Sequence, residues 1–402
     1  MTRARFAFHW RVNGRPPMGP VLGVVGLLIL TSLTLGLFTG QLPLVSAGAG
    51  NGSGGLDLPA GADPNRTPTP SNIVLVTPSI NIPGSFVFAK KGNIWVETAG
   101  VAHQITVGGD ASMPSWSPDG QWIYYIETVR GRGYFPNVGT SPVYYSMTYP
   151  ILWRIHPDGT AGRRLTDGVY HTGPGGSWTW FYWLREPVMS PNGHTIALVS
   201  DAPDPTRSDV VLQFFDTRTG KLTKPALPED PPLGHQDPAW SPDGKQVVYV
   251  YDSRDGTRGT PSLYLFDPAT GRNSQLTGPG YLSPSFSPDG RYIAATTTST
   301  FGTDVVILDA KTGAELLRVT DDGQSWDPVW SPAGDAVAFL HLSYQTVDLR
   351  VVQLGGAAPR WTLGATVELT QYSGLDGASR PGWFIPAAEL ASPAPAPSPS
   401  SP

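Results

Sequence analysis

The sequence predicts an all-β protein, a six-bladed β-propeller closed by its C-terminal strand. Three observations predict this fold. A unit of the type Pro-x-Trp-Ser-Pro-Asp-Gly recurs along the chain, the 402 residues include 47 Gly and 42 Pro, and no long amphipathic helical pattern follows residue 40. Repetition, abundant turn residues and the lack of a helical period together favour a ring of short antiparallel strands.

The repeat is clearest at Pro238-Ala-Trp-Ser-Pro-Asp-Gly244, which precedes the alternating run Lys245–Tyr251. Proline presets φ, aspartate bonds to its own backbone and glycine accepts a positive φ, so a tight hairpin is expected. The alternating β-branched and aromatic residues that follow are typical of a half-buried strand. Further copies open at Pro114, Pro187, Pro284, Pro328 and, in degraded form, Pro381.

The opening prolines lie 44 to 73 residues apart, a spacing that suits one four-stranded blade with loop insertions. Each hairpin is followed by a third strand, a polar turn and a short outer strand. We expect third strands to begin at Leu152, Val211, Leu263, Val305 and Leu349, and outer strands to begin at Arg164, Ser274, Leu316 and Trp361.

The two ends of the repeat region complement each other. Three strands near Ser85–Lys90, Asn93–Glu97 and His103–Val107 lack an opening strand, whereas Pro381–Ile385 is an opening strand with no hairpin after it. Joined, they make one complete blade, which gives the count of six.

The N-terminus predicts an exported protein. Four arginines at positions 3 to 15 precede an uncharged apolar run over 21–38, just long enough to cross ~30 Å of hydrocarbon, and no Lys or Arg follows until Arg66. We expect a single-pass membrane protein with a cytoplasmic N-terminus. The alternative is a signal peptide cleaved near Val45-Ser-Ala47, which would still leave the folded part outside.

The expected organisation has five parts. Residues 1–20 form a short basic cytoplasmic segment, 21–38 the transmembrane anchor, 39–82 a flexible Gly/Pro/Ser linker, 83–388 the propeller and 389–402 a disordered Ala/Pro/Ser tail. The formal net charge of −5 argues against a nucleic-acid partner. The absence of cysteine removes disulfides, thiol chemistry and zinc-thiolate sites.

The motif Pro-x-Trp-Ser-Pro-Asp-Gly before an apolar strand, with Arg-Leu-Thr-like outer strands after it, resembles the TolB-type repeats, a WD40-like propeller family. The resemblance covers about residues 83 to 388. It implies the fold, but not one activity, because the family includes binding modules, peptidase gating domains and a few enzymes.

Residues just before each opening proline are expected to ring the mouth of the central channel. We take a polar set of these residues as candidate ligand-binding side chains. An ion site or an acid and base pair is one interpretation of the carboxylates, and a simply solvated rim is the other. The set is Arg185, Glu186, His235, Asp237, Trp326, Asp327 and Arg380.

Aromatic residues gather in an insertion of the first clear repeat and in the connection that follows it. Exposed aromatics near Arg are favoured at interfaces and as stacking platforms for sugars. The other interpretation is that part of this set forms a buried outer strand. The candidates are Tyr134, Phe135, Tyr144, Tyr145, Tyr149, Trp178 and Trp180.

No catalytic motif is found. The turns do not match sialidase aspartate boxes, there is no Gly-x-Ser-x-Gly nucleophile elbow, and the seven histidines are scattered. We expect a membrane-tethered, extracytoplasmic and monomeric binding or scaffold module for a protein, peptide or cell-envelope glycan, with no cofactor, metal or catalytic residue. The alternative is a hydrolase or lyase at the channel mouth.

Overall fold

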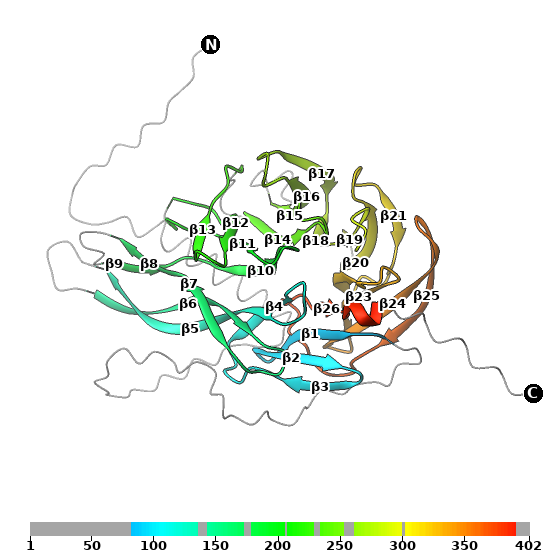
Figure 1. Ribbon diagram of the computed structural model, residues 1–402, viewed down its shortest axis with the longest axis horizontal. Helices are drawn as coiled ribbons and strands as arrows, with labels where there is room; N and C mark the ends of the chain where they lie inside the picture. Colours follow the sequence, from blue (N-terminus) through cyan, green and yellow to red (C-terminus); the bar gives the residue numbers. More distant parts are fainter. Residues whose placement is uncertain are drawn as a thin grey trace, which may run out of the picture. The chain divides into compact units, whose positions relative to one another are not determined.

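The computed structural model describes residues 82–390, all within the compact unit Leu58–Pro402, except 136–142, 173–177, 206, 229–233, 253–260 and 300–301. Within these residues the fold is a six-bladed β-propeller, as the repeats predict (Figure 1). No helix of the described part is long and apolar enough to cross a membrane. The apolar run 21–38 and the tail from residue 391 lie outside it.

Each blade is an antiparallel sheet. Blade I contains β26 (Gly382–Phe384), β1 (Ser85–Lys90), β2 (Asn93–Thr98) and β3 (Val101–Gln104). Blade II contains β4 (Ala111–Trp116), β5 (Ile123–Phe135), β6 (Val143–Ile155) and β7 (Arg163–Asp167), extended by β8 (Val169–Thr172) and β9 (Trp178–Phe181). Blade III contains β10 (Arg185–Met189), β11 (Thr195–Ser200), β12 (Val211–Asp216) and β13 (Lys221–Thr223).

The remaining blades follow the same order. Blade IV contains β14 (His235–Trp240), β15 (Val247–Tyr251), β16 (Ser262–Phe266) and β17 (Asn273–Pro279). Blade V contains β18 (Tyr281–Phe286), β19 (Tyr292–Ser299), β20 (Gly302–Asp309) and β21 (Glu315–Arg318). Blade VI contains β22 (Ser325–Trp330), β23 (Ala336–Ser343), β24 (Thr346–Ala357) and β25 (Arg360–Glu368), and a short helix α2 (Ala387–Leu390) follows β26.

The ring is closed by blade I, in which the last strand of the chain completes the first sheet. Phe86 of β1 pairs with Trp383 of β26, and their rings lie 4.6 Å apart. The opening strands contact one another in the order β4, β10, β14, β18 and β22, and β22 contacts β26. The C-terminal strand is therefore the closing element predicted from the sequence.

The Ser-Pro-Asp-Gly turns are built as their residue types predict. In the blade IV turn, Ser241 Oγ donates to Asp243 Oδ1 at 2.7 Å and accepts the backbone N–H of Gln246 at 2.9 Å, while Gly244 has a φ of 69°. The repeat tryptophan packs between blades: the ring of Trp240 lies 5.6 Å from that of Phe214 in blade III. The repeat motif therefore has a structural role in the blades.

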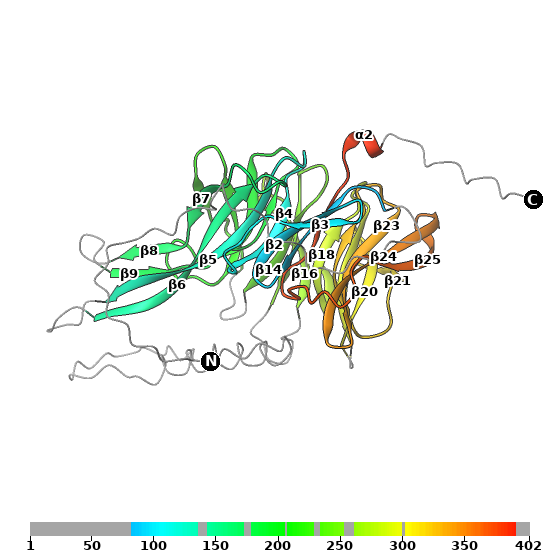
Figure 2. The same cartoon turned by 90° about the horizontal axis from the view of Figure 1, so that it is seen from below.

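Blade II departs from the others because β5 and β6 continue beyond it. β4 begins opposite Glu127, yet the ladder between β5 and β6 runs on to Phe135. The projecting part lies on the side where β4 starts, which is the channel-mouth side. Figure 2 shows β5, β6, β8 and β9 extending together away from the other strands.

Candidate functional site

The residue before the opening proline has the same unusual backbone conformation in five blades. Its φ lies between 48° and 55°, a left-handed value that a non-glycine residue rarely adopts. At this place the ladder between the first two strands of each blade carries a bulge. The five residues are Met113, Glu186, Asp237, Ser283 and Asp327.

The side chains at these bulges connect one blade to the next. Met113 Sδ accepts the backbone N–H of Glu186 at 3.4 Å, Glu186 Oε2 accepts that of Asp237 at 2.5 Å, and Asp237 Oδ2 accepts that of Ser283 at 3.0 Å. Ser379 Oγ accepts the N–H of Met113 at 2.6 Å. At each bulge, one backbone N–H cannot pair with the neighbouring strand of its own blade. The preceding blade supplies the hydrogen-bond acceptor that this buried N–H requires.

Asp237, Ser283 and Asp327 lie in a short row. Ser283 Oγ lies 2.6 Å from Asp327 Oδ1 and 3.2 Å from Asp237 Oδ2, but one hydroxyl has only one proton to donate. The serine proton serves the nearer oxygen, Asp327 Oδ1, while Asp237 Oδ2 also accepts the Ser283 backbone N–H at 3.0 Å. Ser283 therefore links the two carboxyls of neighbouring blades.

The pKa values of two carboxyls in this region are raised. Burial, and next the negative charge of Asp237, raise the pKa of Asp327 to about 6. The same two causes raise the pKa of Glu186 to about 7. The Arg380 guanidinium lies beside Asp237, with Nη2 3.6 Å from Oδ1, and donates from Nη1 to the Pro284 carbonyl at 2.9 Å.

The channel encloses a cavity of about 510 Å³. Glu186, Asp237, Asp327 and Arg380 lie among its lining residues, and the rest of the lining is mostly apolar, including the repeat tryptophans Trp116 and Trp240 and prolines of the Ser-Pro turns. A polar mouth thus leads to an apolar interior, a combination suited to binding an organic ligand.

Catalysis has less support in this geometry. Both carboxylate oxygens of Glu186 already have partners, because Oε1 pairs with Arg185 Nη2 at 3.2 Å and Oε2 accepts the Asp237 N–H. A general acid or base must instead present a free proton position to a substrate. Among the described residues, no three His, Asp or Glu side chains are grouped so that they could hold a metal ion.

His235, predicted at the channel mouth, lies inside the sheet. It is 1% exposed, Nδ1 accepts the backbone N–H of Leu212 at 3.0 Å, and Nε2 lies 3.0 Å from the Pro228 carbonyl oxygen. In other blades a threonine hydroxyl fills the same role, as Thr277 does for Leu263. The imidazole replaces that hydroxyl in blade III, so His235 is a structural residue.

Two other predicted mouth residues are not among the residues that line the cavity. Trp326 donates from Nε1 to the Gly377 carbonyl at 2.8 Å and packs against the hydrophobic cluster between blades VI and I. Arg185 pairs with Glu186 but does not line the cavity. The structure therefore brings together Glu186, Asp237, Asp327 and Arg380 from the predicted set.

The aromatic candidates divide between the two faces of the β5–β6 extension. Tyr145 and Tyr149 lie on the covered face, where Tyr145 Oη donates to the Thr179 carbonyl at 2.6 Å and its ring lies 5.5 Å from that of Trp180. Tyr144 lies on the opposite face and is 58% exposed. Tyr134 pairs with Tyr144 and shares its face. The side chains of Phe135 and Trp178 are outside the described residues.

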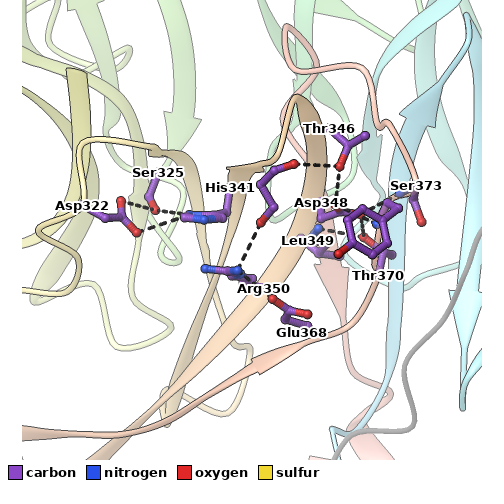
Figure 3. Close-up of polar contacts among 12 residues, drawn as sticks. Asp322, Ser325, His341, Thr346, Asp348, Leu349, Arg350, Glu368, Thr370 and Ser373 are labelled. Atoms are coloured by element: carbon purple, nitrogen blue, oxygen red, sulfur yellow. Dashed lines mark hydrogen bonds and ion pairs between the residues drawn. The ribbon is translucent and has the colours of Figure 1, made fainter. Parts of the chain in front are cut away.

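Blade VI contains a polar network that the sequence did not indicate (Figure 3). Asp348 is 2% exposed and accepts hydrogen bonds from Thr346 Oγ1, Thr370 Oγ1 and the Ser373 N–H. The Asp348 carboxylate oxygens thus hold the segment after β25 against β24. No motif marks Asp348, because its partners come from two separate stretches, one on β24 and one after β25.

A single histidine, His341 on β23, has two polar neighbours in the same blade. His341 Nδ1 lies 3.0 Å from Ser325 Oγ and 3.4 Å from Asp322 Oδ2, as Figure 3 shows. Burial lowers the pKa of His341. Because Ser325 and Asp322 approach the same ring nitrogen, the three side chains do not form the serine–histidine–aspartate relay of a hydrolase.

Comparison with known proteins gives partial matches. No protein-family model matches the chain. The chain is 29% identical to an uncharacterized protein, Atu1656, of Agrobacterium fabrum over 157 residues (38% of this chain, 44% of that protein). It is 27% identical to the uncharacterized peptidase YuxL of Bacillus subtilis over 162 residues (31% and 24%), and 37% identical to the Tol-Pal system protein TolB of Francisella tularensis over 87 residues (21% and 19%). The matches span less than half of each relative.

Solved structures agree on the fold. TolB from Acinetobacter baumannii has a TM-score of 0.54 at 18% identity, with 75% of this chain and 66% of that chain covered. A putative TolB from Agrobacterium tumefaciens has a TM-score of 0.50 at 19% identity, with 77% and 96% covered. At this identity the likeness concerns the propeller itself.

Proposed function

Since the chain is a β-propeller of the TolB type, we propose that it is a non-catalytic binding module that takes its partner on the channel-mouth face. One observation carries the proposal: the β5–β6 extension of blade II projects on this side and presents an exposed face there. A projecting strand pair adds contact surface without adding to the propeller core.

The proposal is also supported by what the channel carboxylates do. Glu186 and Asp237 accept backbone N–H groups of the next blade, so their oxygens serve the ring. The TolB relatives and structures are consistent with a propeller that binds in the cell envelope. For this chain the partner is a protein, a peptide or an envelope glycan.

We further propose that the module is extracytoplasmic and tethered by the apolar segment 21–38. The support is the sequence: arginines precede the segment, and 18 uncharged residues suffice to span a membrane. Protease protection in spheroplasts tests this, because an external protease should digest the propeller side only.

Site-directed photocrosslinking in cells tests the binding face. A benzophenone amino acid at Thr148, exposed on the β5–β6 extension, should capture one recurring envelope component, identified by its mass. The matched control places the same probe at Lys245, whose side chain is 79% exposed in a Ser-Pro turn. Equal capture at both positions, or none at Thr148, would contradict the proposal.

A hydrolase or lyase at the channel mouth is the second candidate. It is supported by the raised pKa values of Glu186 and Asp327 and by the partial match to a peptidase. Glu186→Gln and Asp327→Asn variants separate the two functions. An enzyme would lose turnover of a substrate found by screening, whereas a binding module would turn over none.

A further inference from the structure

The outward face of the blade II extension is basic and aromatic within an acidic protein. Side chains on β5 and β6 alternate between exposed and covered positions, as strands require. We call the outward surface the Arg–Tyr face. It consists of Thr128, Arg130, Arg132 and Tyr134 of β5, Tyr144, Ser146 and Thr148 of β6, Thr179 of β9 and His171 of β8.

The covered face explains why these residues are left outside. Gly131 and Gly133 make room there for the rings of Tyr149 and Tyr145, since a Cβ on Gly133 would lie 2.0 Å from Tyr145 Cζ. Met147 between them is 7% exposed. The aromatic side chains of one face therefore stabilise the extension, and the other face contributes nothing to its core.

Tyr134 and Tyr144 form a pair of neighbouring rings on the Arg–Tyr face, tilted by 46° to each other. Their ring centroids lie 5.3 Å apart, and the Arg132 guanidinium carbon lies 5.0 Å from the centroid of the Tyr144 ring. Register continues this row through Thr179 to His171 on β8. Four strands thus present two rings, a hydroxyl and an imidazole in one line.

The charge of the face is unbalanced. Arg130 and Arg132 are both exposed, and neither makes an ion pair with a described residue. None of the nine residues of the face is Asp or Glu, although the chain as a whole carries −5. An anionic partner would therefore find two guanidinium groups able to bind a carboxylate through paired N–H donors.

The composition of the face favours a glycan over a protein. Tyr and Arg also anchor protein interfaces, but this face has no outward Leu, Ile, Val or Met, and its seven polar residues outnumber its two rings, whereas the buried centre of a protein interface is mainly apolar. Tyrosine rings stack against sugar rings, while the threonine and serine hydroxyls suit the hydroxyls of a sugar. We propose that the Arg–Tyr face binds an acidic polysaccharide whose sugars carry carboxylates; this rests on the binding function proposed above and specifies its partner.

The test uses the purified full chain and polyuronate oligosaccharides as the probe, with neutral dextran for comparison. Calorimetric titration should detect polyuronate binding that weakens as salt rises, and no dextran binding. Arg130→Gln/Arg132→Gln should weaken binding at least about 10-fold, because charge-assisted hydrogen bonds are lost. Tyr144→Ala should also weaken it. The matched control, Arg218→Gln/Arg272→Gln, removes two exposed charges elsewhere and should bind as the wild type does.

Three results would overturn the inference. They are an absence of polyuronate binding by the wild type, an equal loss in the control pair, and tighter binding of poly-glutamate through Arg130 and Arg132, which would indicate an acidic protein partner. If polyuronate fails to bind while crosslinking from Thr148 still captures an envelope protein, the binding function stands and only the glycan is wrong.

Discussion

Replacement of Asp327 by Asn should stabilise the propeller at neutral and higher pH. The asparagine Oδ1 can accept the Ser283 Oγ proton as the carboxyl oxygen does, but the side chain carries no charge to bury. The folded-state pKa is raised from 3.8 to about 6, so the favourable neutral form is fully present below about pH 3.8 and is lost as the pH rises through 6. The full difference corresponds to about 3 kcal/mol of stability lost by the wild type above pH 7.

Urea unfolding of both proteins at intervals from pH 4 to pH 8 measures this difference. Asp327→Asn should unfold at higher urea than the wild type at pH 8, by up to about 3 kcal/mol in the free energy of unfolding, and the gap should shrink towards zero at pH 4. Ser283→Ala is the companion variant, because it removes the hydroxyl that joins Asp327 to Asp237. A gap that does not change with pH, or a less stable Asn variant at pH 8, would refute the cost assigned to burying the Asp327 charge.

Three further outcomes are expected. Trp383→Ala, which removes the closing contact of blade I, should cost about 3 to 5 kcal/mol by urea unfolding, whereas Trp183→Ala, at a ring 40% exposed, should cost much less. His235→Ala should lower the free energy of unfolding by about 1 to 3 kcal/mol, because the Leu212 N–H loses its acceptor, and should leave partner binding intact. A loss of binding at unchanged stability would show that His235 belongs to the binding site. Gly133→Ala should displace the Tyr145 ring and speed tryptic cleavage at Arg130 and Arg132, with little change in the urea midpoint; unchanged cleavage would contradict the packing described.

The blade count and the ring closure could be predicted because both depend on local chemistry. Each Pro-x-Trp-Ser-Pro-Asp-Gly copy specifies its own hairpin, and the opening strand missing near Ser85 is found at Pro381. The opening proline of each repeat also indicates which residues precede it at the channel. Glu186, Asp237 and Asp327, predicted in this way, line the cavity.

The errors arose where side-chain direction depends on other blades. His235 was expected at the mouth because it lies two residues before Asp237, but its ring turns to an N–H of blade III that no threonine serves. The contacts of Ser283 with Asp237 and Asp327 join three blades, so no local pattern predicts them. By contrast, the two faces of the β5–β6 extension follow from alternation, since Gly131 and Gly133 already mark the covered one.

The pairing of β26 with β1 also sets an order of events during synthesis. Ser85 and Phe384 meet in one sheet although nearly 300 residues separate them, so the first blade stays incomplete until the last strand has been made. At about 5 to 20 residues per second, that interval lasts roughly 15 to 60 s. Throughout it, β1 exposes an unpaired edge, which is the kind of surface that chaperones shield and that mispairs when crowded. A weakened closing strand would therefore lower the folding yield before it lowered the stability of the finished ring.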